Sequence, residues 1–341
     1  MSMRKVVTIV GTRPELIKMS RVIAAFDEYT EHVLVHTGQN FDYELNEVFF
    51  EDLDIRKPDH FLEVSGGSAC DTIAKVIQAS EKLLAEEKPD AVLLYGDTNS
   101  CLSIIPAKRQ KIPVFHMEAG NRCYDQRVPE ELNRKVVDHL SDINIVLAEH
   151  ARRNLLAEGL PSQTIFKSGS HMPEVLEYAK SKIEKSDTLA RLELQEQGYF
   201  LVSTHREENV DSPSRLTEFL KVMQQLTKEF GKKVVVSTHP RTRMRLLELD
   251  HELDSEEVTF LKPFGFVDYI ALQMDADCVL SDSGTITEES SLLGFPAVNV
   301  RQMHERPEGV DAGILPMADF NLDKITDAIR VARHLRDTEA A

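Results

Sequence analysis

Short apolar runs and amphipathic stretches alternate along nearly the whole chain. The apolar runs are rich in Val, Ile and Leu and have the length of buried strands, while the stretches between them have helical spacing. Strands that alternate with helices predict doubly wound parallel sheets, an α/β fold. The predicted strands are Lys5–Val10, Val33–His36, Ala91–Tyr95, Val114–His116 and Ile143–Leu147 in the first half, and Tyr199–Ser203, Lys233–Ser237, Val258–Leu261, Cys278–Leu280 and Ala297–Val300 in the second.

The strands fall into two series, which predict two Rossmann-like domains facing each other across a cleft. A loop with Gly169 and Pro173 separates the series, and a chain of 341 residues is long for a single core. We therefore expect a first domain over residues 1–168 and a second over residues 172–321. The last helical pattern, Leu322–Leu335, has no strand after it. Residues 322–341 are accordingly expected to form a helix that packs back on the first domain.

Polar clusters follow the predicted strands in both halves. Ligands of open α/β sheets bind at the carboxyl ends of the strands, where these clusters would meet. Each cluster alone has a structural explanation: Asp97 as a helix cap, Glu118 as a carboxylate satisfied by amides, or Glu130 as a first-turn partner of the helix dipole. Their common position at strand ends favours a functional role. The clusters are 11–13 with Lys18 one turn later, 96–100, 116–122, 204–209, 238–241 and 281–285.

The segment from Cys278 to Glu308 has the pattern of a phosphate site. A short strand leads into the small polar loop Ser281–Gly284 and then into a helix that Gly294 ends. The free backbone N–H groups of such a helix start attract anions. Glu288 and Glu289 could accept hydrogen bonds from hydroxyls beside the anion. These features predict a seat for a nucleotide diphosphate, although an ordinary strand–helix crossover would carry the same pattern.

Composition and missing motifs narrow the chemistry. A formal net charge of −17 argues against nucleic acid or an anionic membrane as partner. No transmembrane or signal segment is apparent, and four scattered cysteines fit a cytoplasmic protein. The dinucleotide glycine fingerprint, the P-loop, the nucleophile elbow and metal-ligand spacing are all missing, so neither a cofactor nor a metal is expected. Carboxylates, a histidine and cations remain, which suit proton transfer with departure of a phosphate group.

A series of motifs resembles the non-hydrolysing UDP-N-acetylglucosamine 2-epimerases. In chain order they are GTRPELIK, YGDTNS, HMEAGNR, RVPEELNR, STHREEN, STHPR, DSGTITEE and RQMHERPE. The resemblance implies the glycosyltransferase-B fold, with UDP bound by the second domain, and an enzyme that interconverts UDP-GlcNAc and UDP-ManNAc without a redox cofactor. It implies elimination of UDP to a 2-acetamidoglucal followed by re-addition. A homodimer in polysaccharide biosynthesis is also expected.

The resemblance also implies roles for individual residues. Asp97, Glu118 and Glu130 match the acidic catalytic positions, and His205 would assist at the departing phosphate. The residues expected to bind the substrate are Arg13, Lys18, Tyr269, Ser283, Gly284, Thr285, Glu289 and Arg306. Within this set, Ser283–Thr285 would hold the phosphate, Glu289 the ribose and Tyr269 the uridine pocket.

Departures from the family motifs leave alternatives open. Asn40 and Glu207 replace a histidine and an arginine of the usual pattern, which weakens the expectation of allosteric control by UDP-GlcNAc. The segment RVPEELNRKVVDHLSDIN resembles a branch that acts on 6-deoxy sugars and forms UDP-L-FucNAc. A hydrolysing relative that releases UDP, a binding protein without catalysis and an ordinary glycosyltransferase remain as further hypotheses.

Overall fold

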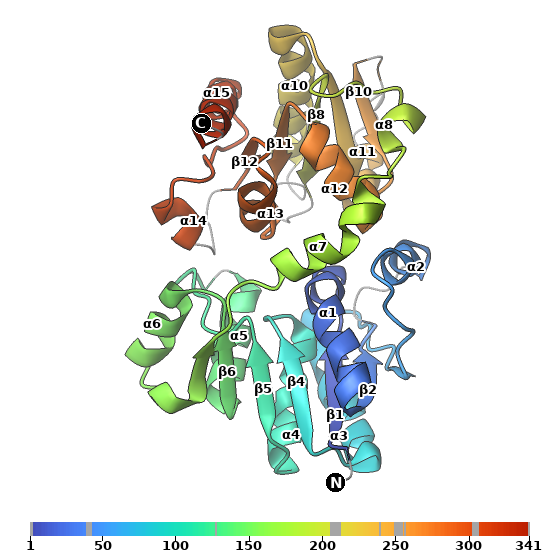
Figure 1. The fold of residues 1–341 in the computed structure, drawn as a ribbon, viewed down its shortest axis with the longest axis vertical. Helices are drawn as coiled ribbons and strands as arrows, with labels where there is room; N and C mark the ends of the chain where they lie inside the picture. Colours follow the sequence, from blue (N-terminus) through green and yellow to red (C-terminus); the bar gives the residue numbers. More distant parts are fainter. Residues whose placement is uncertain are drawn as a thin grey trace. The chain divides into compact units, whose positions relative to one another are not determined.

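The computed structural model describes residues 3–38, 43–126, 128–204, 213–238, 240–248, 255, 257–301 and 307–339. The chain forms two compact units, Met1–Ala179 and Lys180–Ala341 (Figure 1). The division falls within helix α7 (Met172–Ile183), just beyond the loop of residues 169–171 in which the sequence placed it.

The first unit is built on a parallel sheet with the strand order β3-β2-β1-β4-β5-β6-β7. Its strands are β1 (Lys5–Val10), β2 (Glu31–His36), β3 (His60–Phe61), β4 (Ala91–Tyr95), β5 (Val114–Met117), β6 (Ile143–Val146) and β7 (Ile165–Lys167). The helices are α1 (Arg13–Tyr29), α2 (Tyr43–Asp52), α3 (Ala69–Glu87), α4 (Ile104–Arg109), α5 (Pro129–Leu140) and α6 (Glu149–Ala157), with 3-10 turns at Asn99–Ser103 and Ser162–Thr164.

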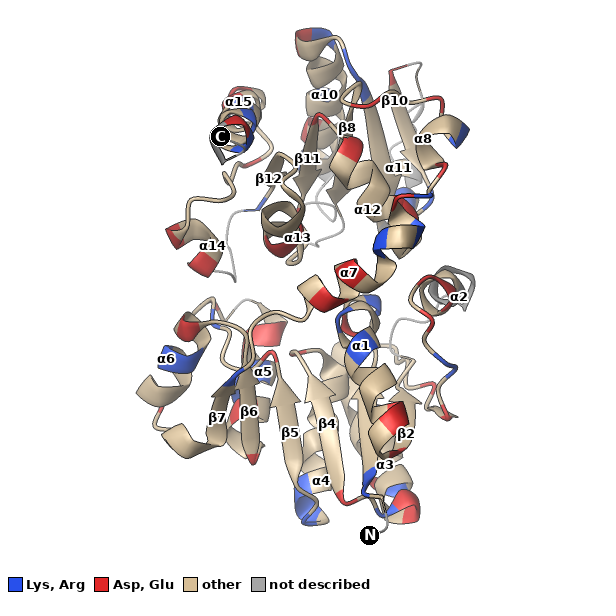
Figure 2. Ribbon diagram, in the orientation of Figure 1, with Lys and Arg blue, Asp and Glu red and all other residues tan. Residues whose placement is uncertain are grey.

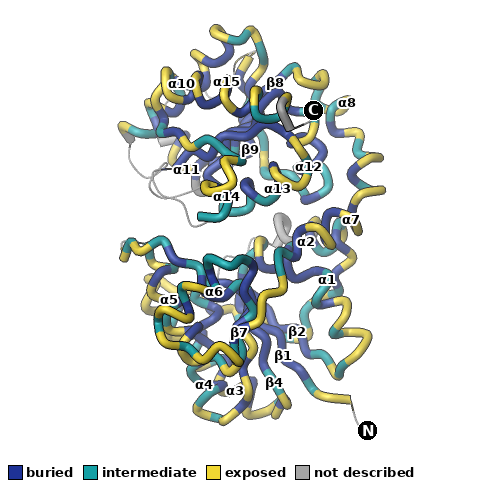
Figure 3. Tube along the Cα trace, turned by 60° about the vertical axis from the view of Figure 1, so that its left-hand side comes forward, coloured by how far each residue is buried: buried dark blue, intermediate teal, exposed yellow. Residues whose placement is uncertain are grey.

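Alternate residues of the central strands define the core of this unit. Val7 and Ile9 of β1 and Leu94 of β4 pack in one cluster with Leu84 of α3 and Val137 of α5. Figure 1 shows α1 on the opposite face of the sheet, in front of β1 and β2. Because both faces are covered, the strands are apolar on both sides, and Figure 3 shows them buried.

The second unit contains a five-stranded parallel sheet with the order β10-β9-β8-β11-β12. Its strands are β8 (Tyr199–Thr204), β9 (Lys233–Thr238), β10 (Val258–Leu261), β11 (Cys278–Ser281) and β12 (Ala297–Asn299). The helices are α8 (Thr188–Arg191), α10 (Pro213–Phe230), α11 (Pro240–Glu248), α12 (Phe266–Asp275), α13 (Ile286–Leu293), α14 (Pro307–Asp311) and α15 (Leu322–Glu339). Phe200 and Leu280 face one core cluster, and Tyr199 and Val279 face the other.

The predicted strands are confirmed, with ends that differ by one or two residues, and β3 and β7 are additional. Helix α15 buries Ile325 and Ile329 in the core of the second unit. The expectation that this helix also packs back on the first unit stays a prediction. Charged residues lie mainly on helices and loops (Figure 2). Among the described residues, no helix is both long and apolar enough to cross a membrane.

Candidate active site

The strand order of the first sheet reverses between β1 and β4, and polar loops leave both strands at this point. Ligands of doubly wound sheets bind at such switch points. Gly11, the residue after β1, is packed so closely that an added Cβ would overlap the Ser100 and Thr37 hydroxyls. Only glycine therefore allows this approach of the two loops.

Glu15 of α1 joins the loops that follow β1 and β4. One carboxylate oxygen accepts hydrogen bonds from the backbone N–H groups of Gly11 and Thr12, and the other accepts one from Thr98 Oγ1 at 2.6 Å. The Thr12–Glu15 spacing that predicted a helix cap thus also ties the two loops together. Burial of the carboxylate raises the pKa of Glu15 to about 7, although the three hydrogen bonds oppose the shift.

A Glu15→Gln variant is expected to change the pH dependence of stability. A carboxyl whose pKa rises from 4.5 to about 7 on folding contributes stability that is fully present below pH 4.5 and is lost as the pH rises through 7. Glutamine can accept from both N–H groups and donate to Thr98, yet it does not ionise. Relative to the native chain, the variant should gain up to about 3 kcal/mol between pH 5 and pH 8. Urea unfolding at both pH values measures this, with the exposed Glu86→Gln as control. Parallel pH profiles of the native chain and Glu15→Gln would contradict it.

Asp97 follows β4 and is held by helix α5. Arg134 donates to Asp97 Oδ2 from Nε at 3.1 Å and from Nη2 at 2.6 Å. Asn133 Nδ2 donates to the backbone carbonyl of Asp97 at 3.0 Å. Arg134 also donates to the buried Glu131, which accepts from the Cys123 N–H as well. Both the carboxylate and the backbone of Asp97 are therefore fixed by one helix.

Glu118 follows the neighbouring strand β5 in a left-handed conformation with a φ of 60°. Its Oε2 atom accepts hydrogen bonds from Lys18 Nζ and from the Tyr95 hydroxyl, both at 2.6 Å. Lys18, which was expected near the diphosphate, is thus an immediate partner of Glu118. A positive φ is unusual outside glycine and is retained where the surroundings hold it.

The remaining predicted residues of the first unit lie on the two helices that flank these loops. Glu130 is in the first turn of α5 and is partly exposed, four positions before Arg134. Arg13 begins α1, where its guanidinium lies 5.6 Å from the centroid of the Phe49 ring. Neighbouring strand ends thus carry Asp97 and Glu118, and α5 and α1 add Glu130 and the cations. His205 lies outside the described residues.

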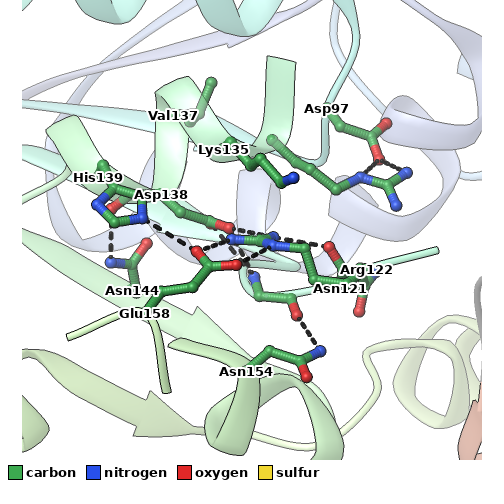
Figure 4. Close-up of polar contacts among 12 residues, drawn as sticks. Asp97, Asn121, Arg122, Lys135, Val137, Asp138, His139, Asn144, Asn154 and Glu158 are labelled. Carbon is green, nitrogen blue, oxygen red and sulfur yellow. Dashed lines mark hydrogen bonds and ion pairs between the residues drawn. The ribbon is translucent and has the colours of Figure 1, made fainter. Parts of the chain in front are cut away.

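A buried charge cluster that the sequence did not reveal lies behind these loops. Arg122 lies between Asp138 and Glu158 (Figure 4), with distances of 2.7 Å to Asp138 Oδ2 and 2.6 Å to Glu158 Oε2. His116 Nδ1 lies 2.9 Å from Asp138 Oδ1. Burial alone would lower the pKa of His116, but the contacts with Asp138 and the Gly96 carbonyl outweigh it and raise this pKa. The HMEAGNR motif contained His116 and Arg122, but their partners, Asp138 of α5 and Glu158 at the end of α6, were not predicted.

In the second unit, the turn after β11 leads into α13 at the switch point between β8 and β11. Ser283 Oγ lies 2.9 Å from Thr285 Oγ1, and the Ser283 N–H donates to Ser281 Oγ. Gly284 has open space around the position of a Cβ. The predicted phosphate turn is thus compact and internally hydrogen-bonded.

Tyr269 and Glu289 lie close to this turn. Burial, and after it the charge of Glu289, raises the pKa of Tyr269. Hydrogen bonds with Ser203 and Ser281 lower this pKa and so reduce the shift. These bonds place the phenol at the ends of β8 and β11. Glu289 is buried, and its Oε2 accepts from Gln273 Nε2 at 2.7 Å. Arg306 lies outside the described residues, and so do Asn40 and Glu207.

The described residues contain no group of three or more His, Cys, Asp or Glu side chains that could hold a metal ion.

Comparison with known proteins gives concordant matches over nearly the full chain. The family model for UDP-N-acetylglucosamine 2-epimerase matches residues 24–340. A structure of the enzyme of that name from Rickettsia bellii is 56% identical, with a TM-score of 0.90, and the match covers 97% of this chain and 88% of the other. A Methanocaldococcus jannaschii structure, a UDP-GlcNAc 2-epimerase in complex with UDP-GlcNAc and UDP, is 33% identical with a TM-score of 0.90, covering 96% and 92%.

A Pseudomonas aeruginosa relative carries a different substrate name. It is a UDP-2,3-diacetamido-2,3-dideoxy-D-glucuronate 2-epimerase, 34% identical over 333 residues, 96% of this chain and 92% of the other. The predicted glycosyltransferase-B fold is confirmed by these neighbours and by the Phytolacca americana UGT2 structure, which at 12% identity and a TM-score of 0.58 shares the fold alone.

Proposed function

This chain belongs to the UDP-N-acetylglucosamine 2-epimerase family, and from that premise we propose that it interconverts UDP-GlcNAc and UDP-ManNAc by elimination and re-addition of UDP. The observation that carries the proposal is the set of carboxylates beside cations at one edge of the first sheet. Asp97 and Glu118 leave neighbouring strands, each paired with a cation, and Glu130 lies on the helix that holds Asp97.

The reaction requires acids and bases in this arrangement. C2 of the sugar is not adjacent to a carbonyl group, so its proton is not acidic in the ground state. As the bond from C1 to the UDP oxygen breaks, C1 becomes electron-poor and the C2 proton becomes acidic. A carboxylate removes this proton, which leaves a double bond between C1 and C2. UDP then re-adds at C1, and a proton returns to C2 from the opposite face, which calls for a second acid.

The roles within the second unit are part of the same proposal. The diphosphate is assigned to the Ser283–Thr285 turn, where the first N–H groups of α13 favour an anion. Glu289 is assigned to the ribose and Tyr269 to the uracil side. His205 and Arg306 keep the roles that the family motifs give them, assistance at the departing phosphate and a basic contact.

The proposal is tested by incubating the enzyme with UDP-GlcNAc in deuterated water and following the C2 proton by NMR. Exchange of this proton together with the appearance of UDP-ManNAc is expected. Stoichiometric release of UDP together with free sugar would favour a hydrolysing relative, and turnover only with an added acceptor would favour a glycosyltransferase. Binding of the nucleotide sugar without exchange, UDP release or transfer would indicate a binding protein without catalysis.

The name of the Pseudomonas aeruginosa relative supports a second substrate, a UDP-2,3-diacetamido sugar acid. A parallel incubation with that sugar, and another with the 6-deoxy UDP-2-acetamido sugar that leads to UDP-L-FucNAc, compares the candidates. The substrate with the highest kcat/KM for C2 exchange identifies the sugar series.

A Glu289→Ala variant should bind UDP more weakly by roughly 1–3 kcal/mol, because a charged acceptor for the ribose hydroxyls is lost. Calorimetric titration with UDP measures the change. The exposed Glu196→Ala is a matched control in the same unit and should bind as the native chain does. Equal affinity of Glu289→Ala and the native chain would remove Glu289 from the ribose site.

We further propose that the enzyme is a homodimer and works in the cytoplasm. Helix α5 leaves Leu132, Val136 and Leu140 exposed at intervals of four residues, an apolar stripe on one face. The four cysteines are free, as expected in a reducing compartment.

Introducing glutamate at Leu132 and Val136 together should convert a dimer to monomers in sedimentation velocity, because charged groups would have to be buried against the partner. Val331→Glu, on an equally exposed position of α15, should leave the association unchanged. A double variant that sediments like the native chain would exclude this face of α5 as the interface.

A further inference from the structure

His116 is completely buried beside two groups that can only accept hydrogen bonds. Its Nε2 lies 2.6 Å from the backbone carbonyl of Gly96, and its Nδ1 lies 2.9 Å from a carboxylate oxygen of Asp138. A neutral imidazole has a single N–H and can serve only one of these acceptors. Nε2 hydrogen-bonds to the Gly96 carbonyl, whereas Nδ1 is at ion-pair distance from Asp138 without hydrogen-bond alignment. The adjacent carboxylate favours a second proton on the ring, which makes it an imidazolium paired with Asp138.

Asp138 extends this contact to the loop that carries Glu118. The Gly120 N–H lies 3.2 Å from both carboxylate oxygens of Asp138, and Arg122 Nη1 donates to Oδ2 at 2.7 Å. Figure 4 shows Asp138 reaching from α5 towards Arg122. One carboxylate therefore holds the imidazolium on one side and the backbone two residues after Glu118 on the other.

The two ends of this connection are the loops that bear the proposed catalytic acids. Gly96 immediately precedes Asp97, and both Glu118 and Gly120 have positive φ values, 60° and 81°. Such conformations are unfavourable for residues other than glycine and persist only where neighbouring contacts enforce them. The His116–Asp138 pair supplies contacts at both loops.

We propose that His116 and Asp138 are positioning residues that set the distance between Asp97 and Glu118, an inference that rests on the proposed epimerase function. Stability alone does not call for this pair, because a buried ion pair is often no more stabilising than apolar side chains of similar volume. A fixed distance between Asp97 and Glu118 does require such a pair, because two acids must reach C2 from opposite faces of the sugar. The charges that surround the ring, Asp138, Arg122 beside it and Asp97 beyond Gly96, keep the bridge ionic.

The test compares His116→Gln and His116→Leu. A glutamine amide can donate to the Gly96 carbonyl but cannot carry the positive charge towards Asp138, whereas leucine removes both contacts. We expect kcat for C2 exchange to fall roughly 10–100-fold in His116→Gln, since a shift of about 1 Å in a catalytic group costs this much. The KM and the UDP affinity should stay within a factor of about three, because the substrate-binding groups are untouched. His116→Leu should lose more of kcat than His116→Gln.

His139→Gln is the matched control, because the ion pair of His139 is with Glu158 near the surface and lies outside the His116–Asp138 pair. It should keep the native kcat. If native enzyme exchanges the C2 proton and His116→Gln does so at the same kcat, the inference is overturned. A loss of kcat in His116→Gln that is matched by an equal loss of folded protein, measured by circular dichroism, would overturn it too. If the native enzyme itself shows no exchange, the proposed function fails and this inference fails with it.

Discussion

A Glu118→Gln variant is expected to exchange the C2 proton of the UDP-sugar roughly 10²–10⁴ times more slowly than the native enzyme, the usual cost of removing a positioned acid or base. Glutamine keeps the shape of the side chain, and its amide oxygen can still accept from Lys18 and Tyr95, which both contact Glu118 Oε2. What the variant loses is an oxygen that can take up and return a proton. The loss should therefore appear in kcat, with UDP affinity unchanged.

The measurement is deuterium incorporation at C2, followed by NMR beside the formation of the epimer. Both should fall together, because one proton transfer controls both. Asp97→Asn and Glu130→Gln are expected to behave in the same way, and the exposed Glu86→Gln provides the control. Near-native exchange in any of the three acid variants would show that this residue has a structural role only.

The fold was predictable because the central strands bury both of their faces. The run Ala91–Tyr95 is apolar throughout, and turn or helix signals bound it, so its limits were predicted correctly. Strands β3 and β7 were missed because they contain only two and three residues and lie at the edges of the sheet, where few apolar side chains are required. Their pairing depends on neighbouring strands more than on their own sequence.

The part of the candidate site that lies at strand ends was predictable from the sequence. Asp97 and Glu118 follow neighbouring parallel strands, so their common edge is a consequence of topology. The partners of these side chains were not predictable in the same way. Lys18 is 100 positions from Glu118, and its motif assigned it to the diphosphate. A pairing at this separation depends on how α1 packs against the sheet, which the motif alone does not show.

The buried pair of His116 and Asp138 illustrates the same limit. Alternation along β5 could indicate that His116 points away from solvent, but the choice of partner is made by α5, whose rotation is fixed by the packing of Val137 in the core. Asp138, next to Val137, is thereby brought beneath β5. The acidic Asp138, directly after the core residue Val137 in α5, is the signal that could have suggested a buried ion pair.

Asp138→Ala is expected to lower the free energy of unfolding by about 3–5 kcal/mol, the range for breaking a buried ion pair by removing one partner. Asp138 is completely buried, and its carboxylate contacts His116, Arg122 and the Gly120 N–H. Alanine leaves the imidazolium without its counter-ion in a place that water does not reach. Arg122 retains Glu158, so the larger part of the loss should come from His116.

Urea unfolding of a double-mutant cycle tests this origin. When His116→Leu is combined with Asp138→Ala, no unpaired histidine charge is left, so the double variant should lose at least about 1 kcal/mol less than the sum of the single losses. Glu149→Ala, which breaks exposed ion pairs with Arg152 and Arg153, should cost less than about 1 kcal/mol. Additive losses in the cycle would mean that the two side chains stabilise the unit independently, and the charge on His116 would then not depend on Asp138.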